Sequence, residues 1–134
     1  MKIIGFNFTK ISIEKKEKQE GKLEVKQNIN IEDIIKDKIN ISDEDVLKVT
    51  FGFNVDYSPN FANLELKGVI LLIPGKEDSK KILKEWKDKK MEGNFKIQLF
   101  NFIIHKCNLK ALTLEDELGL PLHVPMPRLN PEKE

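Results

Sequence analysis

The sequence predicts an α+β fold: a four-stranded antiparallel sheet, then a short helix and one long helix packed on one face, then an extended proline-rich ribbon. Three observations favour it. Apolar residues alternate with period two through most of residues 3–73, recur every three to four positions in residues 78–119, and are interrupted by prolines after that. A chain of 134 residues can bury one core, so we expect a single domain spanning residues 1–134.

The first two strands are expected near residues 3–14 and 22–32. In the first, the alternation changes phase at Thr9 and Lys10, which predicts a bulge or a bend. In the second, apolar residues alternate with charged and amide residues, which is typical of a strand with one covered face.

The next two strands, residues 46–57 and 61–73, are predicted to form a hairpin. Phe51 and Phe53 belong to its apolar phase and are expected on the covered face. Every residue from 69 to 73 is apolar, so this end is expected to be covered on both faces, by the chain or by a partner. The turn is expected at Ser58, Pro59 and Asn60.

Two helices follow. Residues 78–90 predict a short surface helix that begins at Asp78 or Ser79 and buries Ile82, Leu83 and Trp86. Residues 94–119 predict a long helix that ends at a C-cap glycine, Gly119. Residues 95–104 leave little polar face, so we expect this helix to meet a second subunit, in a dimer or a dimer of dimers. Candidates for the seam are Phe100 and Ile104.

Composition and motifs exclude several functions. A formal net charge of +1, with Arg128 the only arginine, argues against a nucleic-acid binder. The lone Cys107 and the absence of a long apolar run lead us to expect a cytoplasmic protein without a membrane span. No nucleotide, zinc or catalytic motif occurs, so no enzyme activity and no cofactor is expected.

The two histidines and the acidic residues are expected to have structural or solvated roles. His105 and Cys107 lie two positions apart on a helix and point in different directions, so they predict no metal site. His123 stands alone among prolines and is interpreted as structural. Residues 115–117, "EDE", are interpreted as a solvated helix face rather than a docking patch.

The ribbon "GLPLHVPMP", residues 119–127, allows two interpretations. Its apolar residues alternate like those of a strand, but its prolines cannot donate to a sheet. It is either a strap that closes the core or the border of a groove for extended polypeptide. On the second interpretation the peptide-binding residues are Leu122, Val124 and Met126.

The order of these parts resembles the SecB family of protein-export chaperones, from about residue 6 to residue 127. "FTKISIE" is similar to the family's first strand, and "GLPLHVPMPRL" is similar to the Leu/Pro ribbon after its long helix. The family's C-terminal helix and the acidic tail that engages the export ATPase have no counterpart here. No contact residues for that ATPase carry over.

The resemblance implies an ATP-independent chaperone that binds non-native polypeptide through apolar grooves and is linked to protein export. It also implies a dimer of dimers with the long helices between the sheets. The alternative is a dedicated oligomeric subunit that uses the same ribbon to bind one fixed protein partner. A third hypothesis, an enzyme or a small-ligand module, lacks any cluster of titratable residues in the sequence.

Overall fold

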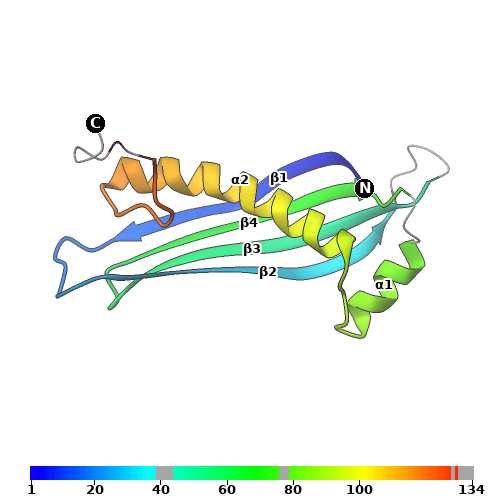
Figure 1. The fold of residues 1–134 in the computed structure, drawn as a ribbon, viewed down its shortest axis with the longest axis horizontal. Coiled ribbons are helices and arrows are strands. Elements are labelled where there is room, and N and C mark those ends of the chain that lie inside the picture. The colour runs from blue at the N-terminus through cyan, green and yellow to red at the C-terminus, as the bar shows by residue number, and fades with distance from the viewer. Residues whose placement is uncertain (39–43, 76–78, 128, 130–134) are drawn as a thin grey trace.

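The computed structural model describes residues 1–38, 44–75, 79–127 and 129. It contains a four-stranded antiparallel sheet and two helices, so the predicted α+β fold is confirmed (Figure 1). The elements are β1 (Lys2–Lys15), β2 (Glu24–Asp37), β3 (Val46–Ser58), β4 (Ala62–Ile73), α1 (Ser79–Lys87) and α2 (Asn94–Leu118).

The sheet has the strand order β1-β4-β3-β2, and every pair of neighbours is antiparallel. The β1–β4 register shifts between Phe8 and Lys10, where the change of phase predicted a bulge. Another shift, between Ile31 and Asp33 in β2, was not predicted. The β3–β4 hairpin turns after Ser58, as expected. Strand β2 extends to Asp37, beyond the predicted boundary at residue 32.

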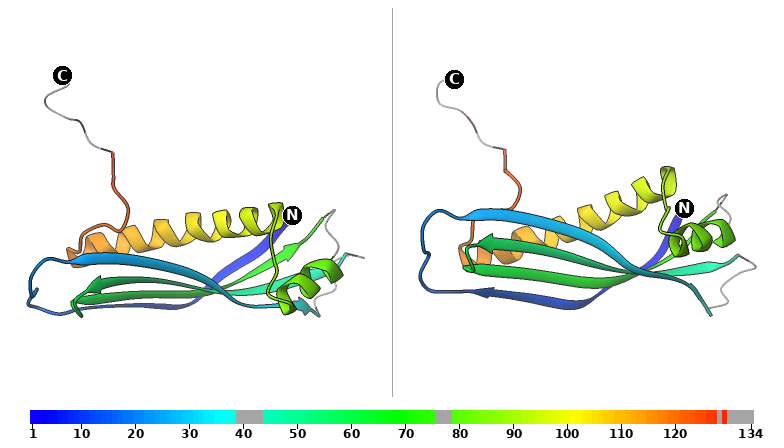
Figure 2. Two further views of the ribbon diagram at one scale, coloured as in Figure 1. Left: turned by 60° about the horizontal axis from the view of Figure 1, so that its bottom comes forward. Right: turned by 90° about the horizontal axis from the view of Figure 1, so that it is seen from below.

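Helix α2 lies along the length of the sheet (Figures 1 and 2). Because side chains alternate across a strand, one face of β3 and β4 supplies the apolar layer beneath it. Phe51 and Phe53 are both buried, as predicted. From α2, the buried residues recur at helical spacing and complete the core: Phe95, Leu99, Ile103, Cys107, Ala111 and Leu114.

One expectation about exposed faces needs correction. The first half of α2 does have a polar face, because Gln98, Asn101 and His105 are exposed on its outer side. At the apolar end of β4, Val69 and Leu71 face away from the helix and are half-buried by the chain, whereas Ile73 in the same phase of the strand is buried. Coverage of this face by a partner stays a prediction.

Helix α1 sits at the end of the sheet opposite the ribbon and lies against β2 (Figure 1). Ile82 is buried, whereas Leu83 and Trp86 are only half-buried. Asp78, one of the two expected caps, lies outside the described residues. The other, Ser79, instead donates its hydroxyl hydrogen to Asp45 Oδ2 at 2.6 Å, and this bond helps to lower the pKa of Asp45.

Candidate functional site

The ribbon, residues 119–127, begins where α2 ends. Gly119 has a φ of 67°, in the left-handed region that glycine adopts without strain, as its predicted C-cap role requires. Its N–H bonds to the carbonyl of Asp116, and the next N–H, from Leu120, bonds to the carbonyl of Glu115 at 2.9 Å. Lys15 donates to the carbonyl of Leu118 at 2.6 Å. The last turn of α2 and one lysine of the sheet therefore fix the start of the ribbon.

A tyrosine from the core fixes the next residue. Tyr57 of β3 donates its hydroxyl hydrogen to the carbonyl of Pro121 at 2.7 Å. Burial raises the pKa of Tyr57, and the carboxylate of Glu115 raises it further, so the hydroxyl keeps the proton that it donates. Because proline has no N–H, this carbonyl is the one backbone group of Pro121 that needs a partner.

A buried polar cluster then binds His123 to α2. Its Nδ1 lies 2.8 Å from Oε2 of Glu115, and its backbone N–H donates to Oε1 of the same carboxylate at 3.0 Å. Its Nε2 lies 2.7 Å from Oδ1 of Asn108, and its ring packs edge-on against Phe53. The side chains of His123 and Glu115 are both fully buried. We call Asn108, Glu115 and His123 the ribbon anchor.

The anchor agrees with a structural role for His123 and corrects the interpretation of residues 115–117. Asp116 and Glu117 are exposed as expected, but Glu115 is buried against His123. A bare carboxylate in the core would be costly. The backbone N–H of His123 and its Nδ1, which lies within hydrogen-bond distance of both carboxylate oxygens, offset that cost.

The anchor also decides which ribbon side chains face outward. Leu120 is buried and Leu122 is 38% exposed, so the apolar residues do not share one face as a strand pattern predicted. Val124 is half-buried and Met126 is 57% exposed. After the anchor the ribbon points away from the sheet and helix (Figure 2). The ribbon is thus fixed to the core through Leu120 and His123, while Leu122 and Met126 expose apolar side chains.

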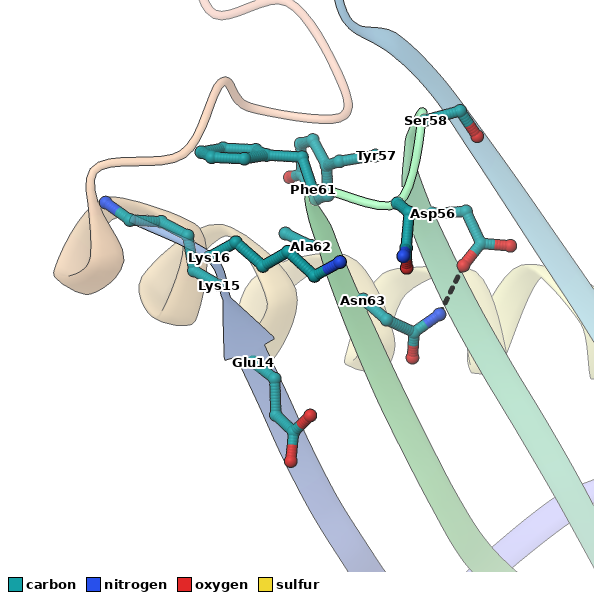
Figure 3. A pocket seen from close by; sticks show the side chains of 10 residues that line it. Glu14, Lys15, Lys16, Asp56, Tyr57, Ser58, Phe61, Ala62 and Asn63 are labelled. Atoms are coloured by element: carbon teal, nitrogen blue, oxygen red, sulfur yellow. Dashed lines mark hydrogen bonds between the residues drawn. The ribbon is translucent and has the colours of Figure 1, made fainter. Parts of the chain in front are cut away.

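A hollow of about 270 Å³ lies beside the same end of the sheet, between the end of β1 and the β3–β4 turn (Figure 3). Its lining is polar and carries both signs of charge, with Lys15, Lys16, Glu14 and Asp56 among the residues. Asn63 is hydrogen-bonded to Asp56 within it. This mixture favours neither an apolar chain nor an ion of one sign.

The expected seam residues lie at the margin of the outer face of α2. Ile104 is 37% exposed and Phe100 is half-buried. Ile97, which was not singled out from the sequence, is 58% exposed and lies one heptad before Ile104 on the same side of the helix. These side chains could meet a second subunit, but that contact stays a prediction.

Among the described residues, Cys107 and His105 do not form a site for metal or thiol chemistry. Cys107 is buried, which raises its pKa to about 12, and His105 is exposed on another side of α2. Within the described ranges, no three His, Cys, Asp or Glu side chains are placed to hold a metal ion. No helix in the part of the chain that the structure describes is long and apolar enough to cross a membrane.

Comparison with known proteins supports the fold. No protein-family model matches the sequence, and no curated protein matches it. A solved structure does match: the SecB-like chaperone Rv1957 of Mycobacterium tuberculosis, in complex with a ChAD peptide from the Rv1956 HigA1 antitoxin. The TM-score is 0.56 at 14% sequence identity, over 96% of this chain and 86% of that chain. The chain has a SecB-like fold. This confirms the fold that the resemblance implied, whereas membership of the SecB family by sequence is not shown.

Within this SecB-like fold, sequence reasoning missed the ribbon anchor, although a signal was present. Three consecutive acids near a helix C-terminus oppose the helix dipole, and Gly119 and the ribbon follow them directly. That arrangement suggests that at least one of the acids has a specific partner. The partner could be the histidine a few residues further on, His123, but the sequence does not show that a turn brings the two together.

Proposed function

We propose that the chain is a SecB-like domain, residues 1–134, that binds non-native polypeptide without catalysis or ATP. The observation that carries this proposal is the outward pair on the anchored ribbon, Leu122 and Met126. The similar fold of a SecB-like chaperone solved with a bound peptide supports it. Burial of a client's apolar side chains would supply the affinity.

The anchoring explains how such a ribbon could bind efficiently. Three prolines restrict its backbone, and the contacts of Tyr57 and His123 hold its first half in place. A client would therefore pay less of the entropy cost of ordering this segment. Met126, which is unbranched, can adapt to varied client side chains, and Val124 borders the same surface.

The double change Leu122→Ser with Met126→Ser tests the ribbon. If each side chain contributes about 1.5 kcal/mol, client binding weakens about 100-fold, and suppression of client aggregation in a light-scattering assay is lost. Melting temperature and particle size are expected to stay near wild type because both side chains are exposed. Ile35→Ser, on the distant end of β2 and 46% exposed, is the matched control and is expected to protect clients normally.

The outcome of this experiment also decides whether Leu122 and Met126 belong to a strap that closes the core or to the border of a groove for polypeptide. A double variant that unfolds makes Leu122 and Met126 part of the strap. A folded double variant that still protects clients places the binding groove elsewhere.

A dedicated subunit with one fixed partner is the alternative proposal, and the antitoxin peptide in the complex of the similar chaperone is the observation that favours it. A peptide array separates the two. Broad binding to apolar sequences supports the chaperone, whereas binding to a single sequence supports the dedicated subunit. In either case the double ribbon variant is expected to bind poorly.

Assembly as a dimer or a dimer of dimers is part of the proposal, with Phe100 and Ile104 at the seam. Ile104→Asp is expected to lower the molar mass measured by size exclusion with light scattering, because a buried carboxylate without a partner opposes association. Gln98→Asp is the control, because Gln98 is exposed on the outer side of α2 and lies about 100° around the helix axis from Ile97. A wild-type protein that is a monomer at high micromolar concentration contradicts this part of the proposal.

A further inference from the structure

A second apolar surface lies at the opposite end of the molecule from the ribbon. It is an open hollow of about 460 Å³ that is lined by residues of β2, α1, α2 and the segment between the two helices. Figure 1 shows α1 and the start of α2 at this end of the sheet. The apolar part of its lining consists of Ile31, Trp86, Met91 and Phe100. Its volume is within the range of ligand pockets, and its apolar lining could bury a large side chain.

The rest of the lining is positively charged. Lys87, Lys89 and Lys96 complete the hollow, and none of the described residues that line it is acidic. Lys96 Nζ lies 5.8 Å from the ring centroid of Phe100, so one cation is placed directly beside the apolar surface. The balanced charge of the whole chain therefore conceals a local excess of positive charge around an apolar pocket.

The backbone at Lys89 is unusual in a way that favours a functional role. Helix α1 ends with the same two hydrogen bonds as α2: Lys89 N–H to the carbonyl of Trp86 at 3.1 Å, and Lys90 N–H to the carbonyl of Glu85 at 2.8 Å. At this position α2 has Gly119, whereas α1 has a lysine with a φ of 57°. A lysine is strained there, and its side chain lines the hollow.

We propose that this hollow binds an acidic peptide segment that carries one large apolar side chain. The apolar side chain would lie against Trp86 and Phe100, and carboxylates before and after it would face the lysines. Three separate cations favour a chain with several negative charges over an amphiphile with a single charged head. The inference goes beyond the proposed function, because the hollow and the ribbon lie at opposite ends and either can fail without the other. Phe100 is shared by the hollow and the proposed subunit seam, so a bound peptide and a second subunit would compete for it.

The protein contains its own reporter for this test. Trp86 is the only tryptophan of the chain, so a change in tryptophan emission reports on the hollow. The probes are two blocked peptides without tryptophan. Both carry one central phenylalanine, which is flanked by aspartates in one peptide and by lysines in the other. We expect the acidic peptide to shift the emission saturably and to bind at least about tenfold more tightly, with an affinity that falls as salt is added.

Charge reversal in the hollow is expected to reverse this preference. The variant Lys87→Glu with Lys96→Glu should bind the lysine-flanked peptide better than the aspartate-flanked one. The control Lys81→Glu with Lys110→Glu makes the same change of charge, with one substitution on each helix outside the hollow, and should keep the wild-type preference. Circular dichroism checks that both variants are folded.

Lys89→Gly separates function from stability. Removal of the strained lysine should raise the melting temperature by a few degrees, and it should lower the affinity for the acidic peptide severalfold. The ribbon variant Leu122→Ser with Met126→Ser should bind the acidic peptide like wild type, which distinguishes this site from the client surface.

Four results would overturn the proposal. The first is equal affinity of the wild-type protein for the two peptides, and the second is an unchanged preference in the reversal variant. The third is a shift of the Trp86 emission by decanoate, an amphiphile with one charged head, at lower concentrations than by the acidic peptide. The fourth is an emission shift that depends only on protein concentration and molar mass. The last two would assign the hollow to a small amphiphile and to a second copy of the chain.

Discussion

Replacement of Phe53 by alanine is expected to lower the free energy of unfolding by about 3–5 kcal/mol. Phe53 is 1% exposed in the middle of β3, and its ring packs edge-on against His123 at a centroid distance of 5.7 Å. The change would leave a cavity under α2 and remove the surface on which His123 rests. Chemical denaturation followed by circular dichroism measures the effect.

Asn54→Ala is the matched control, since the two residues are adjacent in β3 but point to opposite faces. Asn54 is half-exposed, accepts a hydrogen bond from Asn63 at 3.2 Å and donates a long one to Asp56 at 3.5 Å. Loss of these two surface hydrogen bonds is expected to cost no more than about 1 kcal/mol. Equal losses from the two changes would mean that the face of β3 has been assigned incorrectly.

Glu115→Ala is expected to cost about 3–5 kcal/mol, because it leaves the ring and the backbone N–H of His123 buried without their acceptor. The ribbon is also expected to detach from α2, since the contacts of Glu115 to His123 join the two. Glu115→Ala should therefore lose both client protection and stability. The variant Leu122→Ser with Met126→Ser, by contrast, is expected to lose client protection at nearly unchanged stability. Denaturation and the light-scattering assay measure both effects.

The two neighbouring acids provide the controls. Asp116→Ala and Glu117→Ala remove the same charge from the same helix turn, but both side chains are exposed. Each is expected to change stability by less than about 0.5 kcal/mol, with a small gain where a negative charge is removed from a helix C-terminus. If all three alanine variants lose the same stability, the ribbon anchor does not hold the ribbon.

Much of the fold followed from local patterns. The alternation in residues 46–57 placed Phe51 and Phe53 on the covered face, and the change of phase near Thr9 placed a bulge within one residue of the observed shift. Gly119 marked the end of the long helix. These features depend on backbone geometry and on the pattern of hydrophobic residues, and both are properties of short segments.

The candidate sites depended on contacts between segments that are distant in the sequence. Tyr57 meets Pro121 across 64 positions, and no local pattern shows that a core tyrosine will bond to a ribbon carbonyl. The hollow at Trp86 needs Ile31 from β2 beside Phe100 from α2. Whether an acid, a lysine or a leucine is exposed is decided by what packs against it.

By itself, the sequence determined the elements, their order and the apolar face of each strand, because periodicity and capping act within a few residues. Only the tertiary structure decided that Glu115 is buried while Asp116 is exposed, that Leu120 points inward while Leu122 points outward, and that three lysines gather around one tryptophan. The physical reason is that burial and local charge are sums over neighbours, and the fold brings those neighbours together from separate parts of the chain.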